Sequence, residues 1–326
     1  MLFITSRVPR QSTRFRKNRP ISFDYQNTDV SCNLYFCRRN DKEDYIEVGS
    51  QAFFAELKSL PSHVQVLFYI HGFNSLQEKA AFPQTTRLQS RLNETRHGEL
   101  VKVVPIIWPC DDDHPAAIID DYWDDQKASK ASGKMFSRLL GKFDDWRRQE
   151  AQLDDPCRRR INLLAHSMGN NVLQHAFLEW YEEHGPVPQL FRNIFMVGAD
   201  VVNHTLETGQ TGEHIADATR NLVVYFANDD LAMPASKVAN IKQKTLSRRL
   251  GMTGPESLER APRNVIEVDC DDFNNSLDFP DGHTYFIESK DQKIVSPCVE
   301  HFADAIKTGR VTHVERRHKL DRPIGL

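Results

Sequence analysis

The chain has 326 residues, of which 40% are hydrophobic and 27% are charged, and its formal net charge is −3. This composition is typical of a globular protein with a sizeable core, and it gives no reason to expect a nucleic acid or an anionic membrane surface as the main partner. No apolar run approaches the ~18 residues of a membrane-spanning helix, so no membrane span is predicted.

Short strands are predicted near the amino terminus, where apolar and β-branched residues alternate with turn residues. They cover Leu2–Thr5, Asn33–Arg38 and Tyr45–Val48. A longer apolar run predicts a buried strand over Val64–Ile70 that ends at His71-Gly72-Phe73-Asn74. A helix is expected over residues 77–93, followed by a strand over Val101–Trp108.

The second half of the chain continues this alternation of strands and helices. Residues 116–150 have a charged, helical composition, and Ile161–His166 predicts a strand that leads directly into a helix over Met168–Glu183. Further strands are predicted over Phe191–Gly198, Asn221–Ala227 and Val265–Val268. Further helices are expected over residues 235–249 and Val299–Thr308, and the stretch from Gly251 to Pro262 is expected to be a loop.

Strands that alternate with helices indicate an α/β fold with a mostly parallel sheet that is covered by helices on both faces. We expect one domain over residues 1–310, with a small antiparallel edge at the amino terminus and a helical, cap-like arm over residues 111–160. Residues 311–326 are expected to form a charged tail. The six cysteines form no CxxC pair, so neither a zinc site nor a disulfide framework is predicted and a reducing cytoplasm is the expected location.

The most informative stretch is Ala165-His166-Ser167-Met168-Gly169, at the junction of a predicted strand and helix. A serine on such a sharp turn is presented away from the sheet, and small residues two positions before and after it let neighbouring elements pass closely. The pattern predicts a nucleophile elbow with Ser167 as the nucleophile. The alternative is a strand–helix junction whose serine only caps the helix.

A nucleophilic serine needs a general base and an acid that orients it. We predict His283 as the base, because it lies on a glycine-containing loop after the last predicted strand and before the final helix. The predicted strand Asn221–Ala227 ends next to two aspartates, of which Asp230 is the first choice and Asp229 the second. Asp200, which follows the preceding strand, is a third candidate for the acid.

The reaction also needs backbone N–H groups to hold the oxyanion of the intermediate. We predict the N–H of Met168, directly after the serine, and the N–H of Phe73, in the segment that follows the buried strand. The remaining residues of the two segments, His71, Gly72, Asn74 and His166, are expected to line the substrate site. His71 and His166 are expected to pack or orient neighbouring groups rather than to transfer protons.

Several segments together resemble the α/β-hydrolase superfamily, and more narrowly a bacterial family of α/β hydrolases without an assigned substrate. They are Phe3-Ile4-Thr5-Ser6-Arg7, Tyr69-Ile70-His71-Gly72-Phe73-Asn74, Ile107-Trp108-Pro109, Ala165-His166-Ser167-Met168-Gly169-Asn170, Gly198-Ala199-Asp200-Val201, Asp230-Leu231-Ala232-Met233 and Gly282-His283-Thr284-Tyr285-Phe286. The resemblance implies the α/β-hydrolase fold and a triad of Ser167, Asp230 and His283.

These observations lead to the expectation of a cytoplasmic serine hydrolase that cleaves carboxylic esters or thioesters through an acyl-enzyme. Such an enzyme needs neither a metal nor an organic cofactor, and its partner would be a small ester or acyl substrate. Two alternatives remain: a non-catalytic binding protein on the same fold, and an acyltransferase or peptidase with the same triad. The sequence leaves the oligomeric state open.

Overall fold

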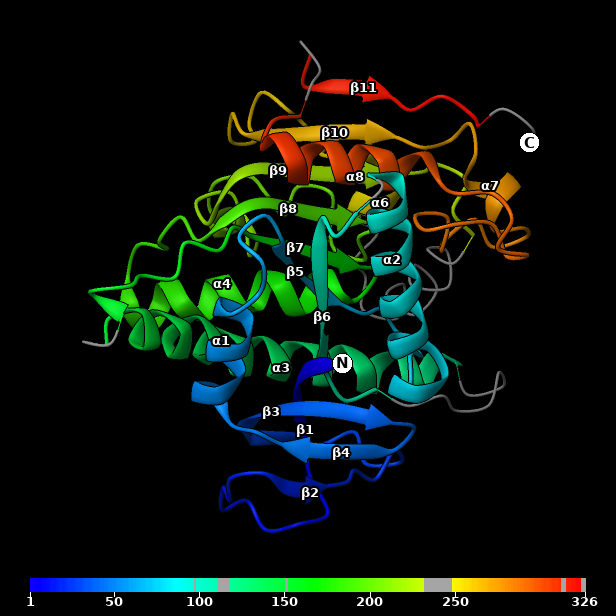
Figure 1. Ribbon diagram of the computed structural model, residues 1–326. Coiled ribbons are helices and arrows are strands. Elements are labelled where there is room, and N and C mark those ends of the chain that lie inside the picture. The colour runs from blue at the N-terminus through cyan, green and yellow to red at the C-terminus, as the bar shows by residue number, and fades with distance from the viewer. Residues whose placement is uncertain (97, 111–117, 150–151, 232–247, 312–314, 324–326) are drawn as a thin grey trace.

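The computed structural model describes residues 1–96, 98–110, 118–149, 152–231, 248–311 and 315–323. Within these residues, a single sheet of eleven strands runs through the molecule in the order β11-β10-β9-β8-β7-β5-β6-β1-β3-β4-β2 (Figure 1). Its strands are β1 (Leu2–Arg7), β2 (Arg19–Ile21), β3 (Val30–Asp41), β4 (Asp44–Glu47), β5 (Gln65–Ile70), β6 (Val101–Ile107), β7 (Ile161–His166), β8 (Phe191–Val197), β9 (Thr219–Phe226), β10 (Val265–Asp269) and β11 (Arg317–Lys319).

Every neighbouring pair from β11 across to β1 is parallel. The strands β3, β4 and β2 then continue the sheet in antiparallel pairs at the amino-terminal edge. The predicted fold class, a mostly parallel sheet with a small antiparallel edge, is therefore confirmed. Parallel strands bring their carboxyl ends to one edge, and open α/β sheets bind their ligands there.

Successive side chains of the central strands point to opposite faces of the sheet, as the strand period of two requires. In β5, Val66, Phe68 and Ile70 belong to one core cluster, whereas Leu67 and Tyr69 belong to the other. The first face is covered by α1 (Ser50–Lys58), α3 (Ile118–Arg147) and α4 (Gly169–His184). The second face is covered by α2 (Phe82–Thr95) and α8 (Pro297–Thr308).

The predicted helical segment of residues 116–150 is largely the long helix α3. Its side chains Met135, Phe136 and Leu139 are buried in the same core cluster as Leu173 and Phe177 of α4. This helix therefore contributes to the core that covers the sheet. Residues 111–117 and 150–151 of the expected arm lie outside the described residues, as does the predicted helix 235–249 except for its last two positions.

Several elements were not predicted from the sequence. They are β2, β11, α1 and the short helices η3 (Glu213–Ile215), α6 (Leu250–Thr253) and α7 (Asn274–Leu277), whereas the predicted helix 77–93 is divided into the π-helix η1 (Gln77–Ala81) and α2. The helix α6 lies in the stretch expected to be a loop. The strand β11 corrects the interpretation of residues 311–326 as a tail, because it adds to the sheet beside β10. The N–H of Glu267 donates to the carbonyl of Arg316 at 2.8 Å.

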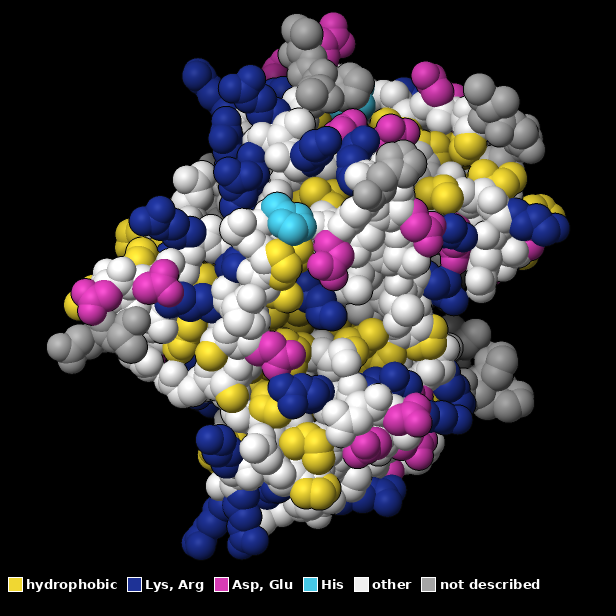
Figure 2. All heavy atoms as spheres, in the orientation of Figure 1, with side chains coloured by type: hydrophobic (Ala, Val, Ile, Leu, Met, Phe, Trp, Pro, Cys, Tyr) yellow, Lys and Arg dark blue, Asp and Glu magenta, His cyan; other side chains and the backbone are white. Residues whose placement is uncertain are grey.

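Arginines form a row across the amino-terminal ends of the central strands. The strand register places Arg192 of β8 opposite Arg220 of β9. Arg263 lies in the turn just before β10, the strand that pairs with β9. Arg160 directly precedes β7. Within the described part of the chain, none of these four arginines forms an ion pair with a carboxylate. Figure 2 shows Lys and Arg side chains gathered over these strand ends, at the upper left. We call these four residues the arginine row.

Candidate active site

Ser167 occupies a sharp turn between the end of β7 and the start of α4. Its backbone φ is 53°, in the left-handed region that non-glycine residues rarely adopt. Its N–H donates to the carbonyl of Val197 at 3.0 Å, which ties the turn to the neighbouring strand β8. A serine held in this strained conformation after a buried strand has the geometry of a nucleophile elbow.

The turn leaves no room for a larger residue at position 169. A Cβ added to Gly169 would lie 2.6 Å from the carbonyl oxygen of His71 and 2.7 Å from that of Ile70. Ala165, two residues before the serine, is fully buried. The small residues that flank Ser167 in the sequence therefore allow β5 and the segment after it to pass close to the turn.

Asn170 holds the turn from inside. Its side-chain Nδ2 donates to the carbonyl oxygens of Ala165 and Ser167, each at 3.0 Å, and its side chain is fully buried. These hydrogen bonds satisfy backbone acceptors that the sharp turn withdraws from regular pairing. Asn170 therefore stabilises the strained conformation of Ser167.

His283 and Asp230 are brought together at the carboxyl edge of the sheet. The Nδ1–H of His283 donates to Oδ2 of Asp230 at 2.6 Å, and the Asp230 side chain is fully buried. Gly198, at the end of β8, borders the pair, since a Cβ there would lie 3.2 Å from Cε1 of His283. The hydrogen bond fixes the tautomer of His283 and leaves Nε2 without a proton when the ring is neutral.

The other two candidate acids interact with different groups. Asp229 accepts hydrogen bonds from Nδ2 of Asn274, at 2.7 Å, and from Nδ2 of Asn275. Asp200 lies 3.3 Å from Nε of Arg249. Of the three aspartates that the sequence left open, the structure thus places Asp230 against His283.

The loop that carries His283 is anchored by Asp278, a buried residue. One carboxylate oxygen, Oδ2, accepts hydrogen bonds from the N–H of His283 at 2.8 Å and from the N–H and hydroxyl of Thr284 at 2.7 and 2.8 Å. Although burial raises the pKa of Asp278, these hydrogen bonds outweigh it and lower the pKa, so the carboxylate stays charged. Asp278 therefore determines where the backbone of His283 lies.

The pKa of His283 is shifted in the opposite direction from that of its neighbour His166. Burial alone lowers the pKa of His283, but the charge of Asp230 and its hydrogen bond outweigh burial and raise the pKa above 6.5. In contrast, burial holds the pKa of His166 well below this value. Its ring packs 4.7 Å from the ring of His283 and 4.7 Å from that of Phe286. His166 is therefore a neutral packing partner of His283.

His71 has both ring nitrogens occupied. Nδ1–H donates to the carbonyl of Gly72 at 2.9 Å, and Nε2 accepts the N–H of Trp108 at 3.2 Å. The ring stacks on the indole of Trp108 with centroids 5.2 Å apart, and burial lowers the pKa of His71 to about 4. A neutral histidine with both nitrogens in use fixes the segment after β5.

That segment and the start of α4 contain the backbone groups that the sequence singled out as oxyanion donors. Met168 lies at the N-cap of α4, where backbone N–H groups lack intrahelical partners and the helix dipole favours negative charge. Phe73 lies between Gly72 and Asn74, and Asn74 has a positive φ of 51°. The two segments meet at the turn, because the carbonyl oxygen of His71 borders Gly169.

Residues 48–296 match a protein family described as alpha/beta hydrolase of unknown function (DUF900). The match covers most of the chain, including the elbow, Asp230 and His283. The chain belongs to this family. The predicted membership of an uncharacterised α/β-hydrolase family is therefore confirmed, whereas no curated protein matches the chain.

The protein thus has the α/β-hydrolase fold and belongs to a family of hydrolases. Two residues at the site of this hydrolase were missed by the sequence analysis, Asn170 and Asp278. Both bind backbone groups, which leave no sequence pattern. The only signal that could have indicated them is a polar side chain at a position that becomes buried. Within the described residues, no group of histidine, cysteine and carboxylate side chains is arranged to hold a metal ion, and no helix could span a membrane.

Proposed function

We propose that this α/β hydrolase is a serine esterase or thioesterase with a triad of Ser167, His283 and Asp230. The observation that carries the proposal is the 2.6 Å hydrogen bond between His283 and the buried Asp230, at the same sheet edge as the strained Ser167. This arrangement gives a serine, a base with a fixed tautomer and an acid that stabilises the charged base.

In the proposed reaction, Oγ of Ser167 attacks the carbonyl carbon of the ester while Nε2 of His283 takes the hydroxyl proton. The N–H groups of Met168 and Phe73 stabilise the oxyanion. The tetrahedral intermediate expels the alcohol or thiol, which takes the proton from His283. Water, deprotonated by His283, then attacks the acyl-enzyme. The bond between the acyl carbon and Oγ of Ser167 breaks, Oγ takes the proton from His283, and the carboxylic acid leaves. His71, Gly72, Asn74 and His166 border the space that the substrate occupies.

A fluorophosphonate probe tests the proposal, because it phosphonylates an activated serine. We expect the folded wild-type protein to be labelled, and we expect Ser167→Ala to abolish labelling and the hydrolysis of p-nitrophenyl esters of graded chain length. Ser90→Ala, which changes an exposed serine on α2, is the matched control and should retain both. His283→Ala should remove hydrolysis without loss of the fold.

Labelling that persists in Ser167→Ala would show that another serine is the nucleophile. If the folded wild-type protein is not labelled at all, the non-catalytic alternative is favoured instead. The chain-length series then separates short-chain from long-chain esterases, and peptide and acyl-acceptor substrates separate the peptidase and acyltransferase alternatives.

A further inference from the structure

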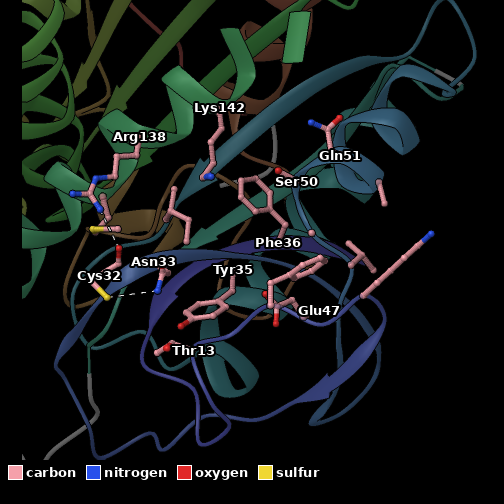
Figure 3. Close-up of a pocket in the computed structure, with 17 residues that line it drawn as sticks. Thr13, Cys32, Asn33, Tyr35, Phe36, Glu47, Ser50, Gln51, Arg138 and Lys142 are labelled. Carbon is pink, nitrogen blue, oxygen red and sulfur yellow. Dashed lines mark hydrogen bonds between the residues drawn. The ribbon is translucent and has the colours of Figure 1, made fainter. Parts of the chain in front are cut away.

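A cavity lies apart from the candidate active site, between the amino-terminal strands and α3 (Figure 3). Its volume is about 710 Å³, within the range of ~300–1,000 Å³ that is usual for small-molecule sites. It is bordered by β3, the start of α1, the loop before β2 and one face of α3, and it contains none of the residues proposed for catalysis.

The floor of this cavity is apolar. Leu34 and Phe36 alternate along β3 and so point to the same face, and both are buried together with Val48 and Met135. The ring of Phe15 lies over Gly49, where a Cβ would approach Cζ of Phe15 to 2.7 Å. The phenylalanine is 55% exposed, so it forms a wall of the cavity that is open to solvent.

Three cations surround this apolar floor. Arg138 and Lys142 are four residues apart on α3, which places them on the face that carries Met135, and Lys17 comes from the loop before β2. Figure 3 shows the side chain of Lys142 directed toward Phe36. Within the described part of the chain, none of the three is paired with a carboxylate.

The single carboxylate that lines the cavity does not neutralise them. Glu47 is buried, and its Oε2 lies 2.6 Å from Nε of Arg19, which balances its charge. Arg138 is partly engaged, because its Nη1 donates to the carbonyl of Cys32 at 3.0 Å. The two ammonium groups of Lys17 and Lys142 are therefore the cations left for an anion.

We propose that this cavity binds a small amphipathic anion, a carboxylate with an alkyl chain. The chain would cover Leu34, Phe36 and Met135, and the carboxylate would accept a hydrogen bond from Lys142, with Lys17 adding to the positive charge around the cavity. A neutral ligand would gain nothing from the two lysines, and a bare anion would leave the apolar floor uncovered. This inference is independent of the proposed esterase function, because the two sites share no residue.

Calorimetric titration of the full chain with dodecanoate, below its critical micelle concentration, tests the proposal. We expect the double variant Lys17→Glu/Lys142→Glu to bind at least about tenfold more weakly, because two attractions become repulsions. Lys130→Glu, an exposed lysine of the same helix outside the cavity, should bind like the wild type. Ala52→Trp, which narrows the cavity without changing its charge, should also weaken binding.

Ester hydrolysis should be unchanged in all these variants, and circular dichroism should show that each is folded. Equal affinity of the wild type, the double variant and Ala52→Trp for dodecanoate would overturn the proposal, because the ligand would then be bound elsewhere, as a product at the active site would be. Dodecanol binding as tightly as dodecanoate, or acetate doing so, would also overturn it. Tighter binding of dodecyl phosphate would overturn the choice of a carboxylate.

Discussion

Three histidines lie within contact distance of one another or of the elbow, and their hydrogen bonds distinguish them. His71 uses both ring nitrogens on backbone groups, and His166 packs against His283 as a neutral ring. Only His283 has a carboxylate partner. A charged imidazolium is therefore stabilised at a single position of this cluster, and that position is the one where a serine hydrolase needs its base.

The raised pKa of His283 predicts the pH dependence of ester hydrolysis. The base must be neutral, so kcat/KM should increase as the pH rises through this pKa and should level off above it, with an apparent pKa higher than 6.5.

Asp230→Asn should lower kcat by about 10⁴-fold, because the tautomer of His283 is no longer fixed.

Asp229→Asn is the matched control, since Asp229 binds Asn274 and Asn275 instead of His283. It should keep most of the activity and the same pH profile. The reverse pattern, with Asp229→Asn inactive and Asp230→Asn active, would assign the acid to Asp229. Steady-state rates with a p-nitrophenyl ester between pH 5 and 9 measure both effects.

At the scale of single residues, part of the candidate site can be predicted from the sequence. Ser167 is marked by its small neighbours and by the strand–helix junction, and His283 by its loop after the last long strand. The aspartates at positions 229 and 230 follow the same predicted strand and cannot be separated by physical reasoning alone, because the path of the loop decides which one meets His283. Asn170 and Asp278 bind backbone groups, and backbone groups leave no pattern in the sequence.

Among the elements of the fold, the arginine row is unusual because like charges stand beside one another on neighbouring strands. Arg192 and Arg220 occupy matched register positions. Burial of Arg192, together with the charges of Arg160 and Arg220, lowers the pKa of Arg192. Like charges in directly opposed positions of a sheet destabilise it.

Arg220→Gln should therefore raise the free energy of unfolding by about 0.5 kcal/mol at low ionic strength, because it removes the central charge of the row. The gain should shrink in high salt, which screens the repulsion. Arg14→Gln, an exposed arginine of the first loop, is the control and should change little. Urea denaturation at two salt concentrations measures the difference, and a loss of stability in Arg220→Gln would contradict this account.

Predictability of an element depends on how strongly its pattern repeats. The buried strands β5 to β9 were predicted to within a few residues, because long apolar runs bounded by turns leave few alternatives. In contrast, β11 is three basic residues long and takes its strand conformation from β10, so no local preference indicates it. The helix α1 was missed although Phe53, Phe54 and Leu57 carry a helical spacing.

For the molecule as a whole, buried histidines link stability to pH. Burial lowers the pKa of His71 and His175 to about 4 and that of His166 well below 6.5. Below pH 6.5 the unfolded chain therefore binds more protons than the folded chain, so these groups favour folding above that pH and destabilise the protein as the pH falls. His283 has the opposite sign, because its pKa is raised.

The free energy of unfolding should therefore fall between pH 6.5 and 5, by about 2 kcal/mol from His71 alone at ~1.4 kcal/mol per pKa unit. His175→Gln should make the decrease smaller, whereas His184→Gln, an exposed histidine near the end of the same helix, should leave it unchanged. Urea titrations at the two pH values measure the slope. Equal stability at both would show that the buried rings already carry protons at pH 6.5.

The architecture could be predicted because alternating strands and helices permit few arrangements, and the parallel order of the sheet follows from the crossover helices. The position of α3 could not be predicted from the sequence, because a charged helix of this length is compatible with an exposed arm as well as with a core layer. Its apolar stripe over Met135, Phe136 and Leu139 decides between them once the neighbouring helix is present.

The parallel sheet places the arginine row and the candidate triad at opposite ends of the same strands. Ser167 follows the carboxyl end of β7, whereas Arg160 precedes its amino end. A negatively charged support, such as a cation-exchange resin or an anionic bead, would therefore hold the molecule by its arginine-bearing rim. Protein immobilised in this way would face the solution with the rim that carries the candidate triad.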